Sequence, residues 1–411
     1  MSLNHKRVVI TGLGVITPIG LNVQEFWQGL AKGQNGIGAI SSFDPGKYPV
    51  KLAAEVKGFN PEDYLDLKRI DRTARVTQFA LASAKMAIES AKLDIKHEKP
   101  ERIGTVIATS GAPTLLIDQA DALKNRGHNR IDPLLASKVG ANMVGVQVGL
   151  EFGLRGPNST VNSACASGND ALGLALNHIR MGHADVMIAG GADASIAPIT
   201  IAATGIVGAL TKSADPVTAC CPFDLNRSGF VFGEGSGIMV LESYEHAVDR
   251  GATILAELAG AGWSFDAYNE TAPYAEVETI AIKMAIQDAG ISPDEVDYIN
   301  AHGTSTQLND CTETKAIKMV FGQRAYKIPV SSNKSMIGHL ATAAGSVEAV
   351  AVVLTILHEI IPPTIHYQTP DPVCDLDYVP NTARLKQVNV CLSNSFGLGG
   401  QNCCLIIKRM V

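Results

Sequence analysis

The stretch Thr160-Val161-Asn162-Ser163-Ala164 is a short β-branched run that leads into a helix of small residues, expected over about residues 166–181. A second stretch, Val330-Ser331-Ser332-Asn333-Lys334, leads through a short loop into a helix expected over about residues 340–358. Both helices are apolar nearly all round, so each should be buried on every side. These two strand-to-buried-helix units predict an internal duplication whose central helices pack between two sheets.

Other short β-branched runs bounded by glycine recur along the chain, with helical stretches between them. Together with the first two they cover residues 8–10, 105–108, 160–162, 186–189, 238–241, 298–301 and 328–331. This alternation predicts an α/β fold with largely buried sheets.

Two further features organise the chain. A helix expected over residues 244–249 ends in Arg250-Gly251, which places a domain boundary there and divides the chain into residues 1–250 and 251–411. Near the C-terminus, residues 388–392 and 403–407 predict a closing hairpin around the glycine-rich segment 394–402. Such a turn lets backbone approach a ligand closely.

The composition indicates a large core. The chain has 411 residues, with 34 lysines and arginines against 40 aspartates and glutamates, a formal net charge of −6. This balance excludes a generic basic nucleic-acid binder. Charged residues make up 18 % of the chain, against roughly 25 % in an average soluble protein, and hydrophobic residues make up 46 %. We therefore expect an oligomer and exclude a disordered protein.

The chain shows no sign of membrane insertion or export. Within residues 340–359, the apolar run is uninterrupted only over residues 349–354, too short to span a membrane. The first apolar run, residues 8–10, ends at Thr11-Gly12, far short of a signal-peptide core. The eight cysteines show neither disulfide-rich nor zinc-binding spacing. Free thiols in a reducing cytoplasm are expected.

Cys165 lies where the first strand gives way to its helix, so its sulfur is expected at a helix N-terminus. The helix dipole and a cationic neighbour should lower its pKa toward a thiolate. Its neighbours in Asn162-Ser163-Ala164-Cys165-Ala166-Ser167-Gly168 are small and leave room around the sulfur. This setting favours a nucleophile over a buried structural cysteine.

Two histidines stand in similar positions. His302 follows a strand, and His339 follows Asn333-Lys334-Ser335-Met336-Ile337-Gly338. Both lie at strand exits among glycines and hydroxyls, where active-site groups gather. With Cys165 they predict a Cys-His-His site. A zinc site is not favoured, because no further thiol or carboxylate lies close in sequence.

The chain resembles the 3-oxoacyl-(acyl-carrier-protein) synthases of the type II elongating class, which are thiolase-fold condensing enzymes. The motifs that carry the resemblance are residues 7–14, 300–306, 375–380 and 393–397. It implies a thiolase-like five-layer αβαβα fold of two pseudo-repeated halves, a cytoplasmic homodimer and acyl carrier protein as partner. The implied reaction is a decarboxylative Claisen condensation of an acyl chain with malonyl-ACP, the elongation step of type II fatty acid biosynthesis.

The resemblance implies roles for the candidate residues. Cys165 would hold the acyl chain as a thioester, while His302 and His339 would hydrogen-bond the enolate left by malonyl decarboxylation. The backbone amides of Cys165 and Leu398 would form the oxyanion hole. Lys334 would be the site lysine, held by Glu313. The phosphopantetheine arm of the carrier protein would contact Thr304 and Thr306.

No cofactor is required by this chemistry, since the substrates carry phosphopantetheine on the carrier protein. A structural monovalent or divalent cation is implied at Asn300, Glu348, Ser393 and Asn394. A basic stretch on an otherwise acidic protein is the candidate docking surface for the acidic carrier protein, although such a run is often simply a solvated helix face. It consists of Lys68, Arg69, Arg72 and Arg75, with Arg130 joining them.

Two positions depart from the family pattern. Leu398 replaces the second aromatic residue of the usual GFGG turn, which gates the nucleophile. Ala112 stands where a bulky residue, often isoleucine, normally lies at the mouth of the acyl pocket. We expect a roomier acyl pocket with altered gating.

Three alternatives stand beside the leading interpretation. A type II polyketide or polyene ketosynthase shares the Cys-His-His chemistry and is the closest. A hydrolase built on Cys165 and His302 would leave His339 and Lys334 idle. A dinucleotide-binding protein is suggested only by Gly12-Leu13-Gly14, which lacks the third glycine.

Overall fold

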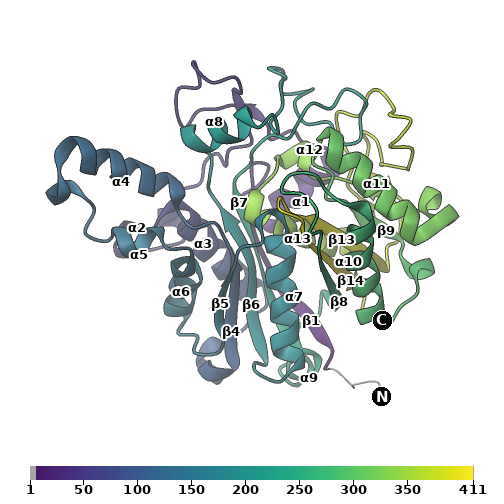
Figure 1. The fold of residues 1–411 in the computed structure, drawn as a ribbon. Helices are drawn as coiled ribbons and strands as arrows, with labels where there is room; N and C mark the ends of the chain where they lie inside the picture. Colours follow the sequence, from purple (N-terminus) through teal and green to yellow (C-terminus); the bar gives the residue numbers. More distant parts are fainter. Residues whose placement is uncertain (1–5, 411) are drawn as a thin grey trace.

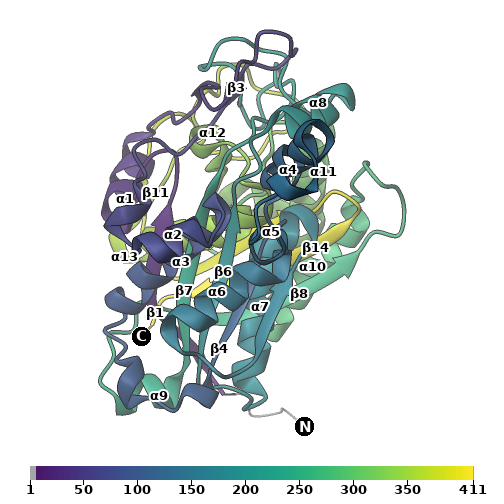
Figure 2. The same ribbon diagram turned by 90° about the vertical axis from the view of Figure 1, so that its left-hand side faces the viewer.

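The computed structural model describes residues 6–410. Ten strands form one continuous sheet in the order β10-β9-β13-β14-β8-β1-β7-β6-β4-β5 (Figures 1 and 2). Their bounds are β1 (Val8–Ile16), β4 (Ile103–Ala108), β5 (Asn158–Val161), β6 (Val186–Asp193), β7 (Gly235–Ser243), β8 (Ala256–Phe265), β9 (Tyr298–Asn300), β10 (Val330–Ser331), β13 (Val390–Phe396) and β14 (Gln401–Lys408). All seven predicted strands are present.

The strand order repeats between the two halves of the chain. The N-terminal half reads β5-β4-β6-β7-β1 and the C-terminal half reads β10-β9-β13-β14-β8. Taken in chain order, each half has its third strand at the outer edge, followed by its second, fourth, fifth and first. The predicted internal duplication is confirmed.

The prediction of two separate sheets needs correction. The first strands of the two halves pair with each other, Val9 with Glu257 and Ile10 with Ala256. This short antiparallel pairing joins the half-sheets into one hydrogen-bonded sheet, because each would otherwise present an open edge in the middle of the molecule.

The central helices are α7 (Ser167–Arg180) and α13 (Ala344–His358), close to their predicted bounds. Each contacts the other and strands of both half-sheets, so both lie between the halves (Figure 1). On the outer faces, α3 (Arg75–Ser90) and α6 (Ala141–Phe152) cover the N-terminal half. The C-terminal half is covered by α10 (Ala275–Asp288), with α11 (Gln307–Phe321) beside it. These layers are the αβαβα arrangement that the resemblance implied.

The segment Ala341–His358 is apolar and long enough to span a membrane by length and composition alone, yet 83 % of it is buried inside the fold. It is the core helix that the sequence predicts.

The glycines of β1 explain why the dinucleotide-binding alternative fails. Gly12 and Gly14 lie within the strand and face α3. A Cβ on Gly12 would lie 2.1 Å from the carbonyl oxygen of Ala87, and one on Gly14 would lie 1.9 Å from that of Ser83. These glycines therefore serve helix-on-strand packing rather than a phosphate-binding turn.

The C-terminal hairpin is present, with a shorter turn than predicted. Strands β13 and β14 pair antiparallel as far as Phe396 and Asn402, so only residues 397–400 form the turn. The helix α9 (Tyr244–Asp249) ends where expected, and β8 starts at Ala256. The domain division at residue 250 stays a prediction.

The other α-helices and the short strands outside the ten-stranded sheet flank these layers. They are α1 (Val23–Lys32), α2 (Leu67–Asp71), α4 (Pro113–Arg126), α5 (Leu135–Val139), α8 (Pro198–Ile206), α12 (Lys334–Ile337), and the two-residue strands β2 (Gly38–Ala39), β3 (Leu52–Ala53), β11 (Ile360–Ile361) and β12 (Arg384–Leu385). One of them, α12, is buried beside the predicted site.

Candidate active site

Cys165 is presented by a tight turn between β5 and α7. Ala164 has a positive φ of 50°, unusual for a residue with a side chain, and its N–H donates to Asn162 Oδ1 at 3.2 Å. The Ser167 hydroxyl accepts a hydrogen bond from the N–H of Ser163 at 2.8 Å. These local bonds hold the chain so that the partly exposed Cys165 lies at the N-terminal end of a buried helix.

His302 is fixed by its backbone. It follows β9, and the N–H groups of His302 and Gly303 each donate to the Glu313 carboxylate at 2.8 Å. The side chain is almost fully buried, and its Nδ1 has no hydrogen-bond partner among residues 6–410.

His339 follows α12, and its N–H donates to the carbonyl of Val231 at 2.7 Å. Its Nδ1 accepts a hydrogen bond from the N–H of Ala341 at 3.2 Å. In a neutral imidazole the other nitrogen then carries the proton. His339 Nε2–H is therefore a hydrogen-bond donor.

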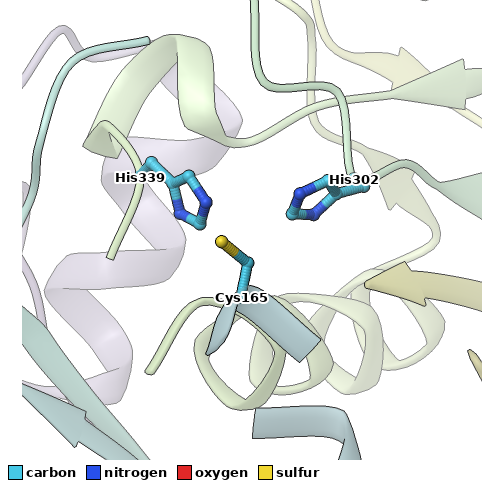
Figure 3. A group of neighbouring side chains, drawn as sticks. All are labelled: Cys165, His302 and His339. Atoms are coloured by element: carbon cyan, nitrogen blue, oxygen red, sulfur yellow. The ribbon is translucent and has the colours of Figure 1, made fainter. Parts of the chain in front are cut away.

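The fold brings the three predicted residues together. The Cys165 sulfur and one ring nitrogen of each histidine lie within 4.8 Å of one another. The two imidazole rings are nearly perpendicular, with centroids 5.4 Å apart, and the sulfur points toward them (Figure 3).

The charge of Lys334 shapes this site. Burial lowers the pKa of both His302 and His339 well below the usual range, and the Lys334 ammonium lowers each pKa further. Both imidazoles are therefore neutral at neutral pH.

The predicted lowering of the Cys165 pKa is wrong in sign. Burial raises the pKa of this thiol, and it outweighs the opposing effects of Lys334 and of two backbone amides. The free protein therefore holds Cys165 as a thiol.

The predicted partner of Lys334 is also wrong. Lys334 Nζ lies 2.5 Å from Glu348 Oε1, and both side chains are buried. Burial raises the pKa of Glu348 to about 7, although Lys334 acts to lower it. Glu313 instead accepts hydrogen bonds from the His302–Gly303 backbone and from Asn394 Nδ2 at 3.0 Å. It supports the His302 loop rather than the lysine.

The turn after β13 places backbone donors at the nucleophile. The backbone amides of Leu398 and of Cys165 itself lie close enough to the sulfur to act against the rise of its pKa. Gly397 permits this approach, because a Cβ there would lie 2.7 Å from the carbonyl oxygen of Ser163. Two amides thus converge where an oxyanion on a Cys165 adduct would form.

Comparison with known proteins agrees with this geometry. The model of the beta-ketoacyl synthase N-terminal domain matches residues 5–247, and that of the C-terminal domain matches residues 255–368. The chain belongs to the beta-ketoacyl synthase family.

Curated relatives narrow the activity. The synthase is 45 % identical to 3-oxoacyl-[acyl-carrier-protein] synthase 2 of Synechocystis sp. over 412 residues, covering 99 % of both chains. It is also 45 % identical to the enzyme of that name from Staphylococcus aureus strain COL, covering 98 % of this chain and 99 % of the other. The prediction of a condensing acyltransferase of fatty acid biosynthesis is confirmed.

Solved structures share the fold. A beta-ketoacyl synthase from Burkholderia phymatum aligns with a TM-score of 0.92 at 32 % identity, covering 99 % of this chain and 100 % of that one. A ketosynthase in complex with its type II PKS acyl-carrier protein aligns with a TM-score of 0.91 at 37 % identity and the same coverage. Polyketide ketosynthases are thus structural neighbours, but the fatty-acid relatives are more similar in sequence.

In this synthase, Ala112 and the nucleophile Cys165 both follow the carboxyl-terminal ends of neighbouring parallel strands. Strands β4 and β5 are parallel neighbours with Ala108 opposite Val161, and Ala112 and Cys165 each follow four residues later. Ala112 is buried, whereas the Leu398 side chain is 64 % exposed. Their gating roles stay predictions.

The predicted arm-binding threonines lie just after His302. The hydroxyls of Thr304 and Thr306 are 2.9 Å apart, and Thr306 also caps α11 by accepting from the N–H of Asn309 at 3.3 Å. Both side chains stand next to the histidine loop.

Two of the five residues of the basic stretch are engaged in ion pairs within the fold. Arg69 pairs with Glu151 at 2.7 Å and donates to Gln147, while Arg75 pairs with Glu234 at 2.7 Å. These two arginines hold the fold together locally. The exposed members without an ion pair among residues 6–410 are Lys68, Arg72 and Arg130.

The four predicted cation ligands share one feature in the synthase. Each has a buried side-chain oxygen without a hydrogen-bond partner among residues 6–410: Asn300 Oδ1, Glu348 Oε2, Ser393 Oγ and Asn394 Oδ1. Neutral and acidic oxygens of this kind suit a hard cation.

Sequence reasoning missed three side chains around the site. Phe230 packs edge-on against His339, and Phe396 against His302, with ring centroids 5.2 and 6.0 Å apart. Buried Asp193 accepts hydrogen bonds from Ser110 and Thr342, and its charge raises the pKa of Cys165. Phe396 lies inside the quoted C-terminal motif, so its position could have been noticed in the sequence. Asp193 ends β6, four residues beyond the strand predicted over residues 186–189.

Proposed function

We propose that this synthase carries a saturated acyl chain on Cys165 and condenses it with malonyl-ACP to give a 3-oxoacyl-ACP two carbons longer. The observation that carries the proposal is the convergence of one thiol, two neutral imidazoles and two backbone amides at a single point. Each of these groups has a task in the two half-reactions.

In the first half-reaction, the Cys165 sulfur attacks the thioester carbonyl of acyl-ACP. The amides of Cys165 and Leu398 stabilise the tetrahedral oxyanion. The carrier thiol then leaves with the proton that Cys165 gives up, so one thioester and one thiol become another thioester and another thiol. A neutral imidazole is suited to hold that proton during the exchange.

In the second half-reaction, malonyl-ACP loses carbon dioxide and leaves an enolate. His339 Nε2–H donates to the enolate oxygen, and His302 supplies the second donor. Neutral donors suit this step, because they stabilise the developing charge without first protonating the carbon nucleophile. The carbanion then attacks the acyl thioester carbonyl, forming the new C–C bond and expelling Cys165 as a thiolate, which takes up a proton from solvent to restore the thiol.

Lys334 and Glu348 set the electrostatics of the site. Glu348 holds Lys334 in place, and the positive charge of Lys334 together with burial lowers the pKa of both histidines and keeps them neutral. A structural cation would be held by the unpartnered oxygens of Asn300, Glu348, Ser393 and Asn394, with no part in the chemistry. The reaction needs no other cofactor.

Acyl carrier protein is the proposed substrate carrier. A structural neighbour is a ketosynthase bound to its acyl-carrier protein. The exposed charges of Lys68, Arg72 and Arg130 suit an acidic partner. In this proposal Thr304 and Thr306, which follow His302 along the chain, would contact the pantetheine arm.

We propose a cytoplasmic homodimer. Eight free cysteines suit a reducing compartment. Strand β5 lies at the outer edge of the sheet with Asn158 and Ser159 exposed, so its open edge can pair with a second copy.

A polyketide ketosynthase remains the second candidate, because the small Ala112 leaves room for an unusual acyl chain. Intact-protein mass spectrometry separates the two. The protein is mixed with acyl-ACP of about four to eighteen carbons and then chased with malonyl-ACP. The proposal predicts an adduct on Cys165 with saturated chains, lost on the chase with release of a 3-oxoacyl product, and no adduct on Cys165→Ala. Absence of an adduct with every saturated chain would favour the polyketide role.

A further inference from the structure

A second pair of cysteines lies away from the active site. Cys311 is on α11 and Cys374 ends the short loop 371–374, and their sulfurs are 3.8 Å apart. Both are free thiols. A disulfide needs about 2.05 Å between sulfurs, so the two must approach by roughly 1.8 Å. Cys311 is partly exposed and Cys374 is buried, so an oxidant from solvent meets Cys311 first.

A buried guanidinium lies against this pair. Arg227 Nη2 donates to Cys311 Sγ at 2.9 Å, and Nη1 donates to Asp371 Oδ2 at 2.7 Å. Burial acts to lower the pKa of Arg227, but Asp310 and Asp371 raise it overall, so the group stays charged. The guanidinium thus holds the Cys311 sulfur in place beside Cys374.

Burial raises the pKa of Cys374, which therefore stays a thiol. The two sulfurs thus differ in exposure, and it is the Cys311 sulfur that accepts the Arg227 hydrogen bond. Cys311 is placed to attack an oxidant, and Cys374 is placed to resolve the product.

The same residues could be taken for a metal site, because Cys311, Asp371 and Cys374 offer ligand atoms within 4.8 Å of one another. Arg227 argues against this reading. Its guanidinium already donates to two of the three ligands and would repel a divalent cation at a separation of a few ångströms. A redox reaction needs no such cation and keeps Arg227 in place.

We infer that Cys311 and Cys374 form an oxidisable dithiol that closes to an intrachain disulfide with a hydroperoxide as oxidant. The Cys311 sulfur attacks the peroxide oxygen, giving a sulfenic acid and water. The Cys374 sulfur then displaces the hydroxyl, giving the disulfide and a second water. Overall, two thiols and one hydrogen peroxide give one disulfide and two waters.

The disulfide would act on the start of α11. Arg227 Nε also donates to the carbonyl of Thr306 at 3.1 Å, and Cys311 lies about one helical turn after Gln307. Moving Cys311 removes one acceptor of Arg227 and displaces the segment that bears Thr306. This consequence, unlike the disulfide itself, rests on the proposed function: the oxidised synthase should show a raised KM for carrier-bound substrate.

The chain offers a clean assay. Trypsin cuts after Lys283, Lys315, Lys334 and Arg384, so residues 284–315 contain only Cys311 and residues 335–384 contain only Cys374. The full-length protein is titrated with hydrogen peroxide, alkylated and digested. The inference predicts a linked pair of these two peptides, 2 Da lighter than their sum and separated by dithiothreitol.

Variants make the result specific. Cys311→Ser and Cys374→Ser should each abolish the linked pair, whereas Cys391→Ser, which alters another buried cysteine, should leave it intact. Two results would overturn the inference: Cys311 and Cys374 remaining alkylatable at peroxide levels that oxidise Cys165, or stoichiometric zinc in the purified protein that is lost in Cys311→Ser. A failure of condensing activity would leave the linked peptides unchanged, so the two proposals fail separately.

Discussion

The substitution Glu242→Gln tests the electrostatic reasoning on a residue far from the chemistry. Glu242 is fully buried in β7 and receives hydrogen bonds from Arg250 at 2.5 and 2.7 Å, from His246 at 2.6 Å and from Thr11. Burial acts to raise the pKa of Glu242, but these partners outweigh it and hold the pKa at about 2.

The magnitude follows from the change in pKa. A fall from 4.5 to about 2 corresponds to about 3 kcal/mol of stability, since each pH unit is worth about 1.4 kcal/mol. This agrees with the roughly 3–5 kcal/mol lost when one partner of a buried ion pair is removed. With an unfolding entropy of about 2.1 cal/mol/K per residue, a loss of this size lowers the Tm of a 411-residue chain by about 4 °C.

The pH dependence has a defined sign. The contribution of Glu242 is complete above its unfolded pKa of 4.5 and is lost as the pH falls toward 2. The hydrogen bond to Glu242 is the main cause of the raised pKa of His246. The contribution of His246 to stability is therefore complete below its unfolded pKa of 6.5 and is lost at higher pH. The difference in Tm between wild type and Glu242→Gln should therefore be largest near pH 6 and should become smaller below pH 4.5.

The assay is thermal unfolding from pH 4 to 8, with Glu257→Gln as control. Glu257 pairs with Arg7, whose side chain is 47 % exposed, so its loss should cost less than about 1 kcal/mol. An equal fall in Tm in the two variants, or a fall in Tm for Glu242→Gln that does not change with pH, would refute the reasoning.

Three further predictions concern the active site. Gly397→Ala should lower kcat for condensation by about 10²–10³-fold, because a Cβ 2.7 Å from the Ser163 carbonyl displaces the Leu398 amide; unchanged kcat speaks against that donor. Lys334→Met should raise the pKa of both histidines and move the acid limb of malonyl decarboxylation to higher pH, and an unmoved limb contradicts the role given to its charge. Ala112→Ile should lower the rate of Cys165 acylation by long chains relative to medium chains, measured with a series of acyl-ACPs; the same profile as wild type sinks the roomier pocket.

Much of the fold was predictable because its signals are local. The helices α7 and α13 are apolar on every side, and a helix of that kind must lie inside the protein. The strands are short apolar runs bounded by glycine. The joining of the half-sheets was not predictable, since it depends on only two residue pairs between β1 and β8.

The site shows the same division. Cys165, His302 and His339 could be selected because each follows a strand in a glycine-rich or small-residue segment. The partner of Lys334 could not, because Glu313 and Glu348 are both acidic and only the helix orientations decide which one meets the lysine. One feature of the sequence could have pointed to Glu348 as the partner of Lys334: it is a carboxylate in an otherwise apolar helix.

The sign of the Cys165 pKa change depends on a balance between burial and nearby charges, which no single motif contains. The prediction that the whole basic stretch is available for docking was wrong for Arg69 and Arg75, for a related reason. Glu151 and Glu234 lie far along the chain from the arginines they neutralise, so their pairing becomes visible only in the folded protein.

The most direct test of the account is to separate the two half-reactions in His339→Ala. After mixing with acyl-ACP, mass spectrometry should find the acyl adduct on Cys165 at a level close to wild type, because sulfur and amides remain. On adding malonyl-ACP, the adduct should disappear from wild type within the chase and persist in the variant, which lacks an enolate donor. Equal loss of acylation and of decarboxylation in the variant would contradict the separate roles assigned to Cys165 and His339.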